Sequence, residues 1–229
     1  MKEQDGPMRT PATDATEFDA RVEFLRRRLG PGDEAIETHH AWVFLAGDRA
    51  WKLRKPIRRD TMDYSTLEAR ERNARAEVRL NRRLAPGMYL GVRRLVLDAS
   101  GRLAVGGAGR VVDWLVEMRR LDRSLALDEC LANGRCEERA LEQVVAHLAR
   151  FYATQPPAIT DGRHLVHRLL GLVTANREPL ATVDAEAATR LHSLQMRVLR
   201  ERPHLFEARA AQGCIVEAHG DLRPEHVIL

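Results

Sequence analysis

The spacing of apolar residues changes near residues 118–121, and this change constrains the fold more than any other feature. Before it, short apolar runs alternate with turn residues, which is typical of antiparallel hairpins. After it, apolar residues recur at helical spacing, as Leu141, Val144, Leu148 and Tyr152 do. Strands followed by helices indicate an α+β chain with two lobes.

Turn and cap signals divide the first lobe further. Residues 1–17 are polar, and we expect a disordered tail there. The expected elements that follow are a helix at 18–29, a hairpin at 42–53, a helix at 65–84, a hairpin at 94–105 and a strand at 111–118. The third of these begins with the pattern Ser65-Thr66-Leu67-Glu68, which resembles a capping box. We therefore expect a strand-rich N-lobe at 18–118 and a helical C-lobe at 119–229.

Composition excludes several classes of protein. The net charge is only +4, from 37 basic and 33 acidic residues, and it is too dispersed to indicate a nucleic-acid-binding surface. No apolar run approaches the length of a membrane span, and the polar N-terminus lacks the apolar core of a signal peptide. The three cysteines form no CxxC pair, which favours a reducing compartment. We expect a cytoplasmic protein without a nucleic-acid or membrane partner.

The C-terminal residues carry the most specific motif. An apolar run at 214–216 leads into His219-Gly220-Asp221, and a loop broken by Pro224 follows before a second apolar run at 227–229. Such a strand end presents one carboxylate with a loop folded behind it. In phosphotransferases a loop of this layout carries an Asp that accepts the proton of the attacking hydroxyl. Asp221 is therefore the candidate catalytic residue.

Lysine is rare in this arginine-rich chain and occurs only as Lys2, Lys52 and Lys55. Lys52 lies in an apolar strand pattern, where a buried ammonium would need a counter-ion. Glu77 on the expected long helix can supply one, and Glu71 lies nearby. Such a pair would hold the lysine head against nucleotide phosphates.

A strand lysine, a helix glutamate, a strand leading to a linker, a helical lobe and an HGD loop follow one another in this chain. This order resembles the aminoglycoside phosphotransferase family, which has a protein-kinase-like fold. The chain is most similar to a bacterial subgroup of such domains that can precede a P-loop ATPase domain. The resemblance covers residues 18–229 and rests on ETHHAWV at 37–43, WKLRKP at 51–56, LNRRLAP at 80–86, YLGV at 89–92 and MRRL at 118–121.

The resemblance implies an ATP-dependent phosphotransferase that acts on a small-molecule hydroxyl, with ATP and Mg²⁺ as cofactors. By position, Lys52 matches the phosphate-binding lysine and Glu77 its partner. Glu117 and Met118 match the linker whose backbone would meet adenine, and Asp221 matches the catalytic base. Residues 38–40 would take the place of a glycine-rich loop over the phosphates.

The chain departs from the family pattern at its end. His226 stands where the family has a metal-binding Asn, and the family's second metal-binding Asp would follow the last residue. We therefore expect an incomplete C-lobe and weak turnover. We also expect an exposed apolar patch near the C-terminus, from helix faces around residues 141–152 and 191–199, and a tendency to self-associate through it.

Other interpretations of the same residues stay open. Lys52 can be a solvent-facing strand residue, Glu77 one more charge on a charged helix, and His226 a surface residue instead of a metal ligand. The alternative function is a nucleotide-binding pseudokinase or interaction module without turnover. A fragment of a longer gene product is a third interpretation.

Overall fold

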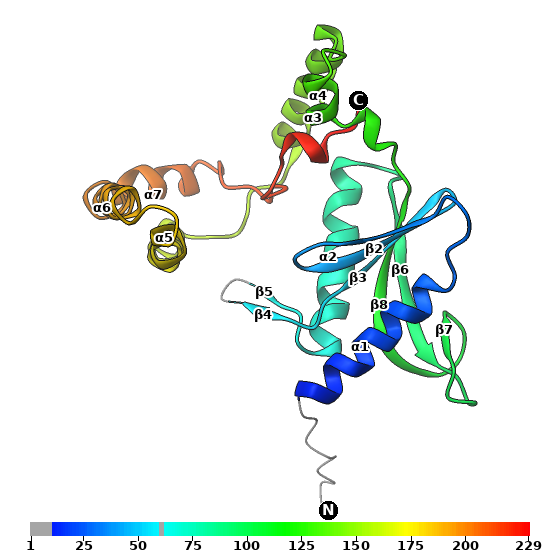
Figure 1. The fold of residues 1–229 in the computed structure, drawn as a ribbon. Coiled ribbons are helices and arrows are strands. Elements are labelled where there is room, and N and C mark those ends of the chain that lie inside the picture. Colours follow the sequence, from blue (N-terminus) through cyan, green and yellow to red (C-terminus); the bar gives the residue numbers. More distant parts are fainter. Residues whose placement is uncertain (1–10, 60–61) are drawn as a thin grey trace, which may run out of the picture. The chain divides into compact units, whose positions relative to one another are not determined.

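The computed structural model describes residues 11–59 and 62–229 (Figure 1). The chain is a mixed α+β protein with two compact units. The first unit contains the described residues up to Glu137 together with Leu222–Leu229, and the second is Glu138–Asp221.

An antiparallel sheet forms the centre of the first unit. Its strands are β1 (Glu34–Glu37), β2 (Ala41–Ala46), β3 (Arg49–Arg54), β6 (Tyr89–Leu97), β7 (Leu103–Val105) and β8 (Arg110–Arg119). They lie in the order β1-β2-β3-β8-β6-β7, and every neighbouring pair is antiparallel. Two short strands, β4 (Arg58–Arg59) and β5 (Met62–Asp63), pair separately. The sheet and the helices that follow confirm the expected α+β plan.

The hairpin of β2 and β3 shows why the local prediction succeeded. Ala46 pairs with Arg49, so Gly47 and Asp48 alone form the turn. Gly47 has φ +55°, a left-handed conformation that glycine adopts without steric cost. The expected hairpin at 94–105 is confirmed too, because Leu97 pairs with Leu103.

Strand β8 is buried on both of its faces, because successive side chains point to opposite sides of a sheet. On one side, Leu115 packs in a cluster with residues of β2, β3 and helix α1 (Pro11–Arg26). On the other side, Trp114 and Val116 pack against Ala74 and Val78 of helix α2 (Leu67–Leu84). This two-sided burial explains the continuous apolar run of the strand.

Helix α1 corrects the expectation of a disordered tail at 1–17. It begins at Pro11, so residues 11–17 are helical, whereas residues 1–10 lie outside the described part of the chain. Proline fits the first helical position because its nitrogen needs no partner there. An ion pair of 3.1 Å between Glu17 and Arg21, one turn apart, stabilises the helix around Phe18.

The start of α2 differs by one residue from the expected capping box. Thr66 is the N-cap, and its hydroxyl accepts a hydrogen bond from the Ala69 nitrogen at 3.1 Å. Ser65 instead bonds the side chain of Asp63 through its nitrogen and its hydroxyl. The cap is therefore local and polar as expected, but the threonine provides it.

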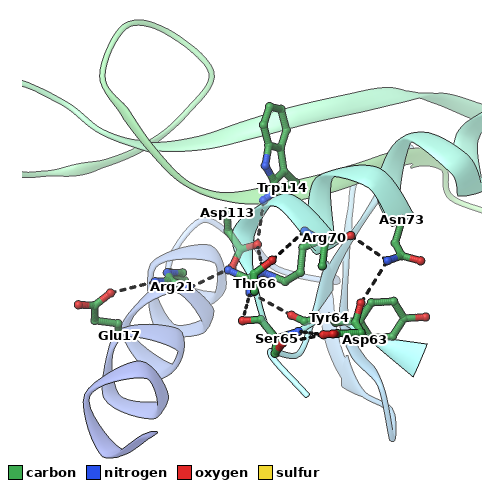
Figure 2. A network of polar contacts seen from close by, with 11 residues as sticks. Glu17, Arg21, Asp63, Tyr64, Ser65, Thr66, Arg70, Asn73, Asp113 and Trp114 are labelled. Carbon is green, nitrogen blue, oxygen red and sulfur yellow. Dashed lines mark hydrogen bonds and ion pairs between the residues drawn. The ribbon is translucent and has the colours of Figure 1, made fainter. Parts of the chain in front are cut away.

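A buried charged network joins both helices to the sheet (Figure 2). The carboxylate of Asp113 on β8 is fully buried and accepts from Arg21 of α1 at 3.0 Å and from Arg70 of α2 at 2.8 Å. It also accepts from the backbone nitrogen of Trp114 at 2.9 Å. Because each charge is satisfied, the network fixes the position of α2 on the sheet.

The second unit is helical. It contains α4 (Glu138–Thr154), α5 (Gly162–Ala181), α6 (Ala185–Glu201) and α7 (Pro203–Ala211), and α5 packs against α6 and α7. Helix α7 was not expected from the sequence, although Pro203 at its first position is a typical start signal. None of the described helices is long and apolar enough to cross a membrane.

The compact units divide later than the expected lobe boundary at residues 118–119. The 3-10 turn η1 (Arg123–Leu125) and helix α3 (Leu127–Ala132) stay with the first unit. The last residues pair with this segment, because the Leu127 nitrogen donates to Val227 and the Leu229 nitrogen donates to Leu125. The expected C-lobe at 119–229 is therefore shared between the two units. Local patterns did not reveal this return of the chain.

Apolar side chains are exposed on two helices of the second unit, whereas the expected apolar patch near the C-terminus stays a prediction. They are Val145 and Tyr152 on α4 and Leu191, Leu194 and Val198 on α6. Val145 exposes 64% and Leu194 51% of its surface. Self-association through these residues stays a prediction.

Candidate functional site

The sheet and helix α2 bring Lys52 and Glu77 together. Lys52 lies on β3, and its Nζ is 2.9 Å from Oε1 of Glu77, across 25 residues of sequence. The Lys52 side chain is 24% exposed and that of Glu77 10%. The expected contact is confirmed. The other candidate, Glu71, pairs with Arg75 one turn along the helix instead.

Arg54 shares the same carboxylate, a contact that was not expected from the sequence. Its Nη2 donates to Oε2 of Glu77, so each carboxylate oxygen binds one cation. The Arg54 guanidinium also lies over the ring of Tyr64, 4.8 Å from its centre. A signal was present, because residues two apart on a strand point to the same face and Arg54 follows Lys52 at that spacing.

The two cations determine the charge state of Glu77. Burial by itself raises the pKa of this carboxyl, but the charges of Lys52 and Arg54 and their hydrogen bonds outweigh burial and hold the pKa below its ordinary value. Glu77 is therefore ionised at neutral pH. Burial, and then the negative charge of Glu77, raise the pKa of Tyr89 to about 12.

The turn between β1 and β2 lies next to the end of β3 that carries Arg54, because Ala41 pairs with Arg54. The Thr38 hydroxyl donates to the Ala41 carbonyl at 2.8 Å and accepts from the Ala41 nitrogen at 3.0 Å, which closes the turn. The Lys55 nitrogen donates to the His40 carbonyl at 3.0 Å and ties the turn to the end of β3. Burial first, and then the positive charge of Arg59, lower the pKa of His40. The His40 ring is therefore neutral at pH 7.

The structure corrects the linker position that the resemblance implied for Glu117 and Met118. Both lie within β8, and not in a linker, and both pair with β3 on one side and β6 on the other. Their backbone is therefore part of the sheet ladder, which disfavours contact with adenine. The Glu117 carboxylate accepts from Arg93 at 2.7 Å. β8 runs from Arg110 to Arg119 and includes both residues, as the strand expected at 111–118 does.

Asp221 is the last residue of the second unit, whereas Lys52 belongs to the first. Gly220 before it has φ +84°, which permits the sharp turn of the HGD motif. The Asp221 nitrogen donates to Nδ1 of His219 at 3.3 Å, so this histidine helps to hold the loop. The role of Asp221 as a base stays a prediction.

His226 ends the 3-10 turn η2 (Pro224–His226), and its Nε2 is 3.5 Å from Nη2 of Arg223. Within residues 11–59 and 62–229, no three His, Cys, Asp or Glu side chains are grouped so that they could hold a metal ion. A metal role for His226 and the binding of Mg²⁺ stay predictions.

Three curated proteins are similar to this chain, and no family model matches it. They are uncharacterized proteins of Mycobacterium bovis and of two strains of Mycobacterium tuberculosis. Each is 33% identical over 205 residues, which are 87% of this chain and 39% of the relative. The chain therefore spans well under half the length of these relatives.

Proposed function

We propose that this chain contains the nucleotide-binding site of an ATP-dependent phosphotransferase that acts on the hydroxyl group of a small molecule. The observation that carries the proposal is the contact between Lys52 of β3 and Glu77 of α2. In protein kinases a strand lysine paired with a helix glutamate holds the nucleotide phosphates. An antiparallel sheet with such a helix on one face, followed by helices, also supports a protein-kinase-like two-lobe fold.

The residues around Lys52 fit a phosphate chain. Glu77 orients the ammonium, and the 24% exposure of the lysine side chain leaves part of it accessible to a ligand. A lysine head is a compact charge suited to a phosphate oxygen. The expected adenine contacts of Glu117 and Met118 are not part of the proposal, because both residues lie in the sheet ladder.

The proposed reaction depends mainly on positioning and on charge. ATP supplies the phosphoryl group, and Mg²⁺, where bound, neutralises charge on the phosphates. Lys52 holds a phosphate oxygen, and Glu77 keeps the lysine in place. Asp221 accepts the proton of the substrate hydroxyl as that oxygen attacks the γ-phosphorus of ATP, and the bond between the γ-phosphorus and the leaving ADP breaks.

A second candidate is a nucleotide-binding module without turnover. His226 favours it, because an imidazole stands where the resemblance places a metal-binding amide. The two candidates share the nucleotide site and differ only in the chemical step.

Calorimetric titration of the purified chain with ATP and Mg²⁺ tests the shared part. Lys52→Met should weaken ATP binding by roughly tenfold or more, because a charge-assisted hydrogen bond is lost. Lys55→Met is the matched control, because Lys55 pairs with Glu37 at 2.6 Å instead of Glu77. Absence of ATP binding by the unmodified chain would refute the proposal.

Release of ADP in the presence of a panel of small hydroxyl compounds separates the two candidates. An enzyme should release ADP with one class of compound, and Asp221→Asn should abolish the release. Nucleotide binding without release would support the module instead.

A further inference from the structure

We infer that Arg54 contacts the phosphate chain together with Lys52, so that the site selects nucleoside di- and triphosphates over monophosphates. This inference rests on the proposed function and assigns the ligand class of the same site. The residues that carry it all belong to the first unit.

Lys52, Arg54 and Glu77 together carry a net positive charge. Lys52 and Arg54 carry two positive charges and share the single negative charge of Glu77, which leaves one positive charge in excess. The three side chains are 24%, 16% and 10% exposed, so water screens this excess only in part. An unbalanced charge in such surroundings is costly unless an anion offsets it.

The neighbours of Arg54 do not remove this excess. The Tyr64 ring offers its face but no formal charge. His40 is neutral at pH 7 for the reasons above, and Arg59 adds positive charge. Lys55 is already balanced by Glu37. The local field around Glu77 is therefore positive and favours a polyanion.

Arg54 also has a hydrogen-bond donor, its Nε atom, without a described partner. Nε of Arg54 is buried and has no hydrogen-bond partner within the part of the chain that the structure describes. Buried polar atoms are nearly always paired, and an arginine offers five donors in a fixed fork. Glu77 binds Nη2 and so orients Arg54, and the exposed 16% of the Arg54 side chain stays accessible to a ligand.

Lys52 and Arg54 also differ in their position along β3. Arg54 pairs with Ala41, directly after the 38–40 turn, whereas Lys52 pairs with Val43. The two cations therefore start roughly 6.6 Å apart along β3, from a rise of about 3.3 Å per residue. Side chains that start at different points and converge on one carboxylate can contact different phosphates of one chain. A di- or triphosphate brings more negative charge to this excess of positive charge than a monophosphate does, and its separate phosphates can meet the two cations.

The test compares ATP, ADP, AMP and adenosine by calorimetric titration. Arg54→Gln should weaken ATP and ADP binding by about 10- to 100-fold, the loss expected for a hydrogen bond between charged groups. Adenosine binding should not change, and Arg54→Lys should restore part of the ATP affinity. Arg49→Gln is the matched control on the same strand, because Arg49 pairs with Asp48 at 3.3 Å, away from Glu77.

The outcomes separate this inference from the proposed function. ATP binding by the unmodified chain with no loss in Arg54→Gln overturns the role of Arg54 and leaves the proposed function standing. Equal losses for all four ligands, adenosine included, show a structural role and also overturn it. Absence of nucleotide binding by the unmodified chain refutes both.

Discussion

Replacement of Asp113 by alanine should strongly destabilise the first unit. The carboxylate is fully buried and accepts three hydrogen bonds, from Arg21, Arg70 and the backbone nitrogen of Trp114. The Arg21 and Arg70 side chains are only 8% and 6% exposed, so neither can turn into water without moving its helix. Asp113→Ala therefore leaves two buried charges without their shared counter-ion.

The expected loss is about 3–5 kcal/mol of unfolding free energy, the usual cost of removing one partner of a buried ion pair. Arg70 keeps bonds to the carbonyls of Tyr64 and Ser65, and Arg21 keeps Glu17, which moderates the loss. A value near the lower end of the range is therefore expected.

Urea unfolding followed by tryptophan fluorescence measures this loss. Trp42, Trp51 and Trp114 all belong to the first unit, so the signal reports on that unit alone. Glu17→Ala is the control, because it removes a partly exposed pair of the same Arg21 and should cost less than about 1 kcal/mol.

A loss below about 1 kcal/mol for Asp113→Ala, with an unchanged dependence on urea, would refute the reasoning. A complementary variant replaces Arg21 and Arg70 by Met and Asp113 by Leu. It should recover much of the stability, because apolar residues of similar size need no counter-ion.

Three further outcomes are expected. Thr66→Ala should lower the unfolding free energy by about 1 kcal/mol in urea titrations, because the N-cap of α2 is lost; no change would contradict the assignment of the cap. Glu77 has a lowered pKa in the folded state, so its stabilising contribution is present above its ordinary value of 4.5 and is lost as the pH falls through the folded pKa. Glu77→Gln should therefore flatten the acid limb of a stability–pH profile, and an unaltered limb would show that other carboxyls control it. If copies associate through the exposed apolar side chains of α6, Leu191→Glu with Leu194→Glu should lower the mass seen in sedimentation experiments at high concentration.

Local structure was predictable where the determinants are close in sequence. The hairpin of β2 and β3 depends on a two-residue turn with Gly47, and the start of α2 depends on a hydroxyl three residues before the nitrogen that it caps. The expectation for Ser65 was wrong by one residue, because the neighbouring Thr66 offers the same group. The extent of α1 was underestimated, because its first turns carry no apolar pattern.

The sequence by itself therefore determined the α+β plan, most strand and helix positions, and the candidates Lys52 and Glu77. Only the tertiary structure decided which charges meet. Arg54 joins Glu77 across 23 residues, and Asp113 joins Arg70 across 43 and Arg21 across 92. Such contacts depend on how strands are ordered in the sheet and which face each helix covers. Periodicity along the chain reports which face a side chain occupies but not which distant residue lies opposite.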